Sequence, residues 1–318
     1  GLRDTVEWRE WLRPFSFRRE GVRVIKNLPY GPAGKRNLLD LYLPHSLPKD
    51  ELCPVLLHVH GGAWMISNKE QQALPLLNHL AQRGWVCVTV NYRLSPRATF
   101  PDHIVDVKQA LAWIRHRIQE YGGNPDFVAI TGGSAGGHLS SLAALTANEV
   151  RYQPGFEYAN TSVQAAVPIY GVYDWNNASG SGGVEALESL LEKHVIKAPR
   201  SADSESWQRG TSLANIHADA PPMFMIHGTH DSLVRVEDAR HFVERLQSVS
   251  RNPVLYAELP GAQHAFEIFH SLRSDFHVIA VTEFLEWAYG SWSAQARNAD
   301  LPPDELRPEL RTATGESA

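Results

Sequence analysis

The chain has 318 residues, of which 43% are hydrophobic and 20% charged, and its net charge is −5 at pH 7. The length suffices for a large buried core, and no basic run suggests nucleic-acid binding. No apolar stretch reaches the roughly 20 residues of a membrane-spanning helix. We expect a cytoplasmic protein, or an exported or membrane-associated one if natural residues precede Gly1, because the sequence does not begin with Met.

Short apolar runs alternate with helical patterns along most of the chain. Strand-like runs occupy residues 22–26, 38–43, 55–60, 86–90, 127–131, 165–169, 223–227 and 254–259. Helical patterns occupy residues 4–13, 103–121, 138–145, 236–248 and 276–289. The first two strands are separated by turn residues and predict a hairpin. The later alternation predicts an α/β fold with a mostly parallel sheet and helices on both faces.

Two segments fall outside this alternation. Residues 174–210 are longer than an ordinary crossover and begin with Gly, Ser and Asn, followed by a short helix around 184–194. We interpret them as a small lid or cap insertion in a single domain that spans 1–290. Residues 291–318 are polar and predict a C-terminal tail without a core of its own.

The segment Gly132-Gly133-Ser134-Ala135-Gly136 lies between a predicted strand and a predicted helix. A G-x-S-x-G sequence in this context is typical of a nucleophile elbow, a tight turn that exposes a serine hydroxyl above the sheet. Side chains at 132 or 136 would collide with neighbouring elements in so sharp a turn. We therefore predict that Ser134 is a catalytic nucleophile.

The acid and base that such a serine needs are found on later strands. Asp231 follows the strand at 223–227, and His264 follows the strand at 254–259. The carboxyl ends of parallel strands meet at one edge of a sheet, so the two side chains are expected near Ser134. His264 would accept the serine proton, and Asp231 would orient the imidazole. Asp174 is an alternative acid, although Asp231 is favoured by its position in the order Ser, Asp, His.

The strand at 55–60 is followed by Gly61-Gly62-Ala63-Trp64, whose small residues leave backbone N–H groups accessible. With the N–H of Ala135, this loop predicts an oxyanion hole. Three aromatic residues adjoin the predicted site and are candidates either for a substrate pocket or for the core: Trp64, Trp175 and Phe266.

Several histidines and both cysteines receive structural interpretations. His60 is expected to brace the loop that follows it, and His138 to pack beneath the nucleophile. His58 and His60 form an H-x-H pattern without a convergent Cys or Glu set, so no metal site is predicted. Cys53 and Cys87 are expected to be reduced core thiols, with a bridge between them as the alternative.

The combined motifs resemble the α/β-hydrolase superfamily, and more closely the bacterial carboxylesterases of the hormone-sensitive-lipase-like group. The resemblance covers residues 20–290 and rests on residues 60–64, 91–96, 132–137, 227–231 and His264. It implies an eight-stranded sheet with an antiparallel second strand. It also implies hydrolysis of short- to medium-chain acyl esters through an acyl-enzyme, with no cofactor. Ala63 departs from the pattern, because many relatives carry a third glycine there.

Two other functions remain open at this point. The chain could hydrolyse an amide or aryl formamide with the same residues, or it could be a non-catalytic binding protein of the same fold. If it is an esterase, we expect a small acyl ester as its partner and a preference for acyl chains of about C2–C8, because residues 174–210 lack the bulky apolar run of an interfacial lid. The oligomeric state is left open, with a homodimer as one option.

Overall fold

The computed structural model describes residues 21–48, 51–178, 180, 185–269 and 271–299. The predicted helix at 4–13 and residues 300–318 lie outside this part.

The described residues form an eight-stranded sheet in the order β1-β2-β4-β3-β5-β6-β7-β8. The strands are β1 (Val22–Pro29), β2 (Leu38–Pro44), β3 (Cys53–Val59), β4 (Val86–Val90), β5 (Gly123–Gly133), β6 (Ala165–Ile169), β7 (Met223–Gly228) and β8 (Val254–Leu259). Strands β1 and β2 form the hairpin predicted from the sequence. Strand β2 runs antiparallel to β1 and β4, and all other pairs are parallel.

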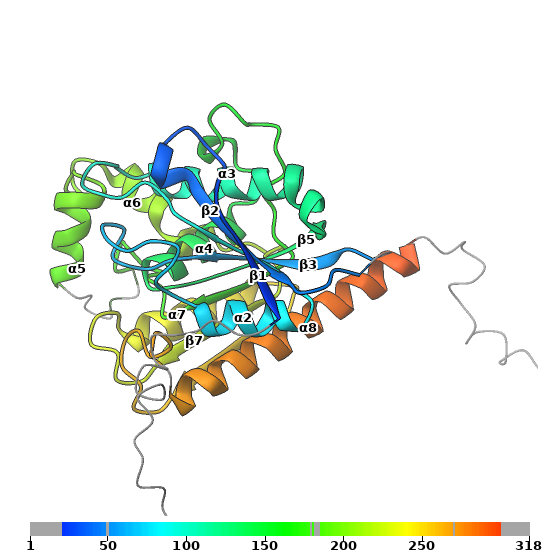
Figure 1. The fold of residues 1–318 in the computed structure, drawn as a ribbon. Coiled ribbons are helices and arrows are strands. Elements are labelled where there is room, and N and C mark those ends of the chain that lie inside the picture. Colours follow the sequence, from blue (N-terminus) through cyan, green and yellow to red (C-terminus); the bar gives the residue numbers. More distant parts are fainter. Residues whose placement is uncertain (1–20, 49–50, 179, 181–184, 270, 300–318) are drawn as a thin grey trace, which may run out of the picture.

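Helices cover both faces of the sheet, as the alternation predicts. One face packs against α3, α4 and α7, and the other packs against α2 and α8; Figure 1 shows α3 above the sheet and α8 below it. These helices are α2 (Leu74–Gln82), α3 (Asp102–Arg117), α4 (Ala135–Leu145), α7 (Val236–Val249) and α8 (Leu272–Ala299). A 3-10 turn at Ile118–Tyr121 completes the helix predicted at 103–121.

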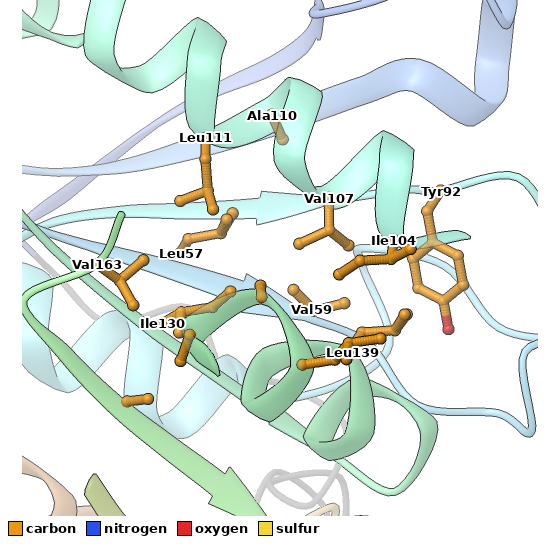
Figure 2. Close-up of a cluster of buried hydrophobic side chains, with 14 of the residues drawn as sticks. Leu57, Val59, Tyr92, Ile104, Val107, Ala110, Leu111, Ile130, Leu139 and Val163 are labelled. Carbon is orange, nitrogen blue, oxygen red and sulfur yellow. The ribbon is translucent and has the colours of Figure 1, made fainter. Parts of the chain in front are cut away.

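The core follows from the alternation of side chains along buried parallel strands. In β3, Leu57 and Val59 face the α3 and α4 side, whereas Leu56 faces α2 and α8. Figure 2 shows Leu57, Val59 and Ile130 of the sheet beneath Val107 of α3. Burial of each such side chain stabilises the fold by about 1.5–3 kcal/mol. This core fixes the carboxyl ends of β3, β5, β7 and β8, from which the candidate site is built.

Helix α2 is absent from the sequence prediction. It has nine residues, begins after Ala73 in a left-handed conformation and carries Pro75 in its first turn. Six of its nine residues are buried, and a helix this short offers only about two and a half turns over which to recognise a helical period.

The C-terminal boundary predicted at 290 is wrong for the fold, because α8 continues to Ala299. Trp292, inside the predicted tail, lies 5.4 Å from the Phe127 ring and stacks on Tyr289 at 6.0 Å between ring centroids. The helix therefore continues for nine residues past the predicted boundary, and Trp292 packs against the core within this extension. The composition of residues 291–318 as a whole concealed this contact.

The described residues of 174–210 form three short helical pieces, and α5 and α6 lie toward one end of the sheet in Figure 1. The pieces are α5 (Glu185–Leu190), a π-helical turn η5 (Leu191–Val195) and α6 (Ser204–Gly210). Leu191, Val195 and Trp207 are buried in the main core. The segment is thus packed against the domain through its apolar side chains. The second helix, α6, is not anticipated by the sequence pattern.

Cys53 and Cys87 are both buried and free, which agrees with reduced thiols and excludes the alternative bridge in this structure. Among the described residues, no helix has the length and apolar character that crossing a membrane requires.

Candidate active site

Ser134 occupies the sharp turn between β5 and α4, with φ 58° and ψ −121°. A Cβ on Gly132 would lie 2.4 Å from the Val59 carbonyl oxygen, and one on Gly136 would lie 2.1 Å from it. Any side chain at these positions would force β3 away from the turn. The Ser134 N–H donates to the Ile169 carbonyl at 3.0 Å and ties the turn to β6. The glycines are therefore required by close backbone packing, as predicted from the sequence.

His264 and Asp231 are brought to Ser134 from the loops after β8 and β7. His264 Nε2 lies 2.9 Å from Ser134 Oγ, and its Nδ1 lies 2.7 Å from Asp231 Oδ2. An ionised carboxylate only accepts, so Nδ1 carries the proton and Nε2 is free to accept from the serine hydroxyl. The order of hydrogen bonds is serine, histidine, aspartate.

Asp231 is held as a carboxylate by its surroundings. The backbone N–H groups of Leu233 and Val234 donate to Oδ1 at 2.9 and 2.8 Å, and His227 Nε2 lies 3.3 Å from Oδ2. Burial alone would raise the Asp231 pKa, but the hydrogen bonds from His227, His264 and Val234 together hold it well below its ordinary value. Asp231 therefore stays negative throughout the neutral range.

Asp174, the alternative acid, has different contacts. It accepts from the Asn176 backbone N–H at 3.1 Å and lines a small hollow with Arg200 and Asp238. The bond from His264 Nδ1 goes to Asp231. The geometry thus favours Asp231 as the partner of His264.

The predicted oxyanion loop divides into two kinds of residue. The Gly61 N–H donates to Gln72 Oε1 at 2.6 Å, so it is already satisfied. Within the described ranges, the N–H groups of Gly62, Ala63 and Ala135 donate to no protein acceptor. Gly61 instead serves packing, because a Cβ there would lie 2.6 Å from the Gly133 carbonyl oxygen. Three of the four predicted donors remain available.

His138 connects the oxyanion loop to the nucleophile helix and to α6. Its Nδ1 accepts from Trp64 Nε1 at 3.2 Å, and its Nε2 donates to the Gly210 carbonyl at 2.6 Å. Trp175 stacks on its ring at 4.5 Å. Burial lowers the His138 pKa to about 4, so the ring is neutral at pH 7. Packing at His138 is predicted from the sequence, whereas this hydrogen-bonded link is not.

The three aromatic residues considered for a substrate pocket differ in their exposure. Trp64 and Trp175 are 1% and 2% exposed and belong to the main core around His138. Their assignment to a substrate pocket is not supported, because almost none of their surface is accessible. Phe266 is half-buried, with its ring 5.4 Å from that of Tyr170.

Tyr170 and Glu267 form a buried pair that sequence reasoning missed. The Tyr170 hydroxyl donates to Glu267 Oε1. The centroid of the Tyr170 ring lies 4.6 Å from the centroid of the His264 ring. Burial raises the Glu267 pKa. A Cβ on Gly133 would lie 2.5 Å from the Tyr170 hydroxyl, so the second glycine of the elbow makes room for this tyrosine. No local motif signals the pair, since its members are 97 residues apart.

His58 and His60 have separate structural partners. His60 Nδ1 lies 2.7 Å from the Gly61 carbonyl oxygen, and the ring stacks on Tyr92 at 4.3 Å, consistent with its predicted bracing role. His58 Nδ1 lies 3.2 Å from Thr89 Oγ1. The described ranges contain no group of three or more His, Cys, Asp or Glu side chains arranged to hold a metal ion.

The chain is similar to known esterases over most of its length. The family model BD-FAE matches residues 39–246. A probable carboxylic ester hydrolase, LipM of Mycobacterium tuberculosis, is 53% identical over 84% of this chain and 62% of its own length. Esterase LipQ of the same organism is 46% identical over 83% of this chain and 62% of its own length. The chain therefore spans less than two thirds of these relatives.

Among solved structures, esterase B from Lactobacillus rhamnosis superimposes with a TM-score of 0.74 at 20% identity. The match covers 88% of this chain and 91% of that one, and at this identity it supports the fold alone. The family-model match extends over more than half of the chain. The chain therefore belongs to the BD-FAE family, and its fold is that of the α/β-hydrolase esterases.

Proposed function

We propose that this chain is a serine carboxylic ester hydrolase that forms an acyl-enzyme on Ser134. The observation that carries the proposal is the hydrogen-bonded order Ser134–His264–Asp231, together with three backbone N–H groups that have no acceptor in the described part of the chain. The esterase names of the relatives at 46–53% identity support the same class of reaction.

In the proposed mechanism, His264 Nε2 accepts the Ser134 proton as Oγ attacks the ester carbonyl. Asp231 stabilises the resulting imidazolium through Nδ1, and His264 then returns the proton to the leaving alcohol. Water enters, gives a proton to His264 and attacks the acyl-enzyme, which releases the acid and restores Ser134. One histidine serves as base and acid in both halves of the reaction.

The N–H groups of Gly62, Ala63 and Ala135 would stabilise the oxyanion of each tetrahedral intermediate. One such donor typically lowers the barrier by about 2.7–4 kcal/mol. Ala135 is the first residue of α4, so the positive end of the helix dipole adds to its effect. The loop donors depend on left-handed conformations at Gly62 and Ala63, with φ 107° and 51°.

We further propose that the substrates are small esters with short to medium acyl chains, and that residues 174–210 act as a cap. Leu187 and Leu190 of α5 pack against the core, and Leu191 is buried in it. Among the described residues of 185–210, no large hydrophobic side chain is exposed. Such a cap offers little apolar surface to a lipid interface, which supports the expected range of about C2–C8.

The test is hydrolysis of p-nitrophenyl acetate and butyrate by the wild type and by Ser134→Ala. We expect kcat/KM to fall by roughly 10⁴–10⁶-fold in the variant, as for other serine triads. A fluorophosphonate probe should label the wild type at Ser134 only. Undiminished turnover by the variant would exclude this nucleophile. A higher kcat/KM on aryl formamides than on esters would identify formamides as the substrates instead of esters. The proposed roles of Ser134, His264 and Asp231 would not change.

A further inference from the structure

A hollow of about 580 Å³ lies beside the oxyanion loop and is lined by three arginines, by the carboxylate of Asp102 and by apolar side chains. Arg36, Arg93 and Arg97 supply the positive charge, and Met65, Leu94 and Ala98 contribute apolar surface. The mechanism proposed above makes no use of it.

The hollow adjoins the loop that carries the candidate oxyanion donors. The Met65 N–H donates to the Gly62 carbonyl at 2.9 Å, and the Ser95 N–H donates to the Trp64 carbonyl at 2.9 Å. Gly61, next in the chain to Gly62, abuts the nucleophile, because a Cβ there would lie 3.3 Å from Ser134 Cβ. The Cα atoms of Ala63 and Met65 are at most about 7.6 Å apart, since consecutive Cα atoms are separated by about 3.8 Å. Met65, which lines the hollow, is therefore close along the chain to the candidate oxyanion donors at Gly62 and Ala63.

The three arginines differ in how their charge is balanced. Arg93 is neutralised by Asp102 and Asp106, each with an N–O distance of 2.8 Å. Arg36 is half-buried, and its hydrogen bond goes to the Ser67 carbonyl at 3.2 Å. Arg97 is exposed at the rim. Within the described part of the chain, neither Arg36 nor Arg97 forms an ion pair with a carboxylate.

The charge of Arg36 also reaches the base of the oxyanion loop. Burial lowers the pKa of His60 to about 4, and the Arg36 guanidinium acts in the same direction. A half-buried cation without a counter-ion carries a desolvation cost that an anion would offset. The planar guanidinium matches a carboxylate or phosphate in shape and donor spacing.

We infer that this hollow receives an anionic group, a carboxylate or phosphate, carried by the ester substrate and bound by Arg36 and Arg97. The inference rests on the proposed esterase function and narrows its substrate class to esters with a second, negatively charged end. The apolar wall formed by Met65 and Leu94 accommodates the carbon chain between the ester and the anion.

The first test places the anion on the acyl half. Mono-4-nitrophenyl glutarate is compared with its neutral isostere, the 4-nitrophenyl ester of glutaramic acid. We expect the wild type to prefer the anionic ester at least tenfold in kcat/KM. The double variant Arg36→Met, Arg97→Gln should bring the ratio within twofold of unity, and Arg36→Lys alone should retain most of it. Arg245→Gln, an exposed arginine on α7, is the matched control and should keep the wild-type ratio.

The second test places the anion on the alcohol half of the ester. It also shows whether the hollow prefers a carboxylate or a phosphate. The substrates are 4-butyryloxybenzoate, 4-butyryloxyphenyl phosphate and the neutral 4-butyryloxybenzamide, each assayed with the wild type and the double variant. The ester whose rate falls most in the double variant, relative to the benzamide, identifies the preferred anion. The preference should shrink in 1 M NaCl, where the Debye length is about 3 Å.

A third measurement does not depend on turnover. Calorimetric titration with glutarate and with inorganic phosphate should show binding to the wild type and a loss of at least tenfold in affinity in the double variant. Equal binding by both proteins, or none by the wild type, would overturn the inference. Equal kcat/KM values of the wild type on the anionic and the neutral ester would also overturn it. Failure of the proposed function is distinct, because no ester would then be hydrolysed and Ser134 would not be labelled.

Discussion

Two histidines lie close to Ser134 and are held by two hydrogen bonds each, yet their surroundings give them opposite properties. His264 is 12% exposed, with a carboxylate at Nδ1 and the serine hydroxyl at Nε2. His138, one turn into α4, is fully buried between an indole N–H donor and a backbone carbonyl acceptor. A carboxylate stabilises an imidazolium, whereas a donor at Nδ1 would oppose one. The first arrangement suits proton transfer, and the second suits a fixed support.

The largest expected effect comes from making the partners of His264 resemble those of His138. Asp231→Asn replaces the carboxylate with a neutral amide, which can no longer stabilise an imidazolium or enforce the Nδ1–H tautomer. We predict that kcat falls by roughly 10⁴-fold while the fold is retained. The measurement is p-nitrophenyl butyrate turnover beside a thermal melt. Asp174→Asn is the matched control, and a loss of similar size there would reverse the assignment of the acid.

The next effect concerns the buried neutral histidines. Burial lowers the folded-state pKa of five of them to between about 3 and 4: His58, His60, His103, His138 and His277. The unfolded value is about 6.5, so below pH 6.5 the unfolded chain binds more protons than the folded one. Stability is then complete above pH 6.5 and is lost as the pH falls toward 4.

We therefore predict that the free energy of unfolding decreases steeply between pH 6.5 and 4, by up to about 1.4 kcal/mol per pH unit for each such histidine. Urea unfolding at pH 7, 6 and 5 measures this slope. His138→Leu should have a shallower slope than the wild type, because one buried titrating group is removed. An unchanged slope would mean that His138 has the same pKa in the folded and the unfolded chain.

A smaller effect is expected from Trp64→Phe, which removes the indole donor to His138 and keeps most of the ring. We predict about a tenfold lower kcat with little change in KM, because the loop that carries the Gly62 and Ala63 donors loses one of its supports. Trp207→Phe is the matched control. It removes an equally buried indole bond, from Nε1 to the Ala198 carbonyl at 3.1 Å, within residues 174–210.

The control should lose about 1 kcal/mol of stability and retain the wild-type kcat. A kcat loss of equal size in Trp64→Phe and Trp207→Phe would attribute both effects to general destabilisation. The comparison therefore separates support of the oxyanion loop from ordinary core packing.

Much of the fold could be predicted because the signals are local. Eight apolar runs and the helices between them are recognised by period and by flanking turn residues. The prediction failed where a local pattern misrepresented its surroundings. Helix α2 is short and buried on most sides, and the polar tail predicted from 291 conceals Trp292, which packs against Phe127.

The candidate site shows the same division. Ser134, Asp231 and His264 were found because each follows a recognisable strand and their order in the chain is restricted by the fold. The Tyr170–Glu267 pair and the Trp64–His138–Gly210 link were not found, since their members are far apart in the sequence. Gly61 was predicted as an oxyanion donor, but Gln72 already accepts its N–H.

By itself, the sequence determined the fold class, the elbow with its required glycines and three residue types in a functional order. These features depend on steric restrictions and periodicity that act over a few residues. Only the tertiary structure decided that Asp231 rather than Asp174 bonds to His264, that Trp64 and Trp175 belong to the core, and that Arg36 is half-buried without a carboxylate partner among the described residues. Each of these depends on distances between strands and loops that are remote in the chain, and folding alone sets those distances.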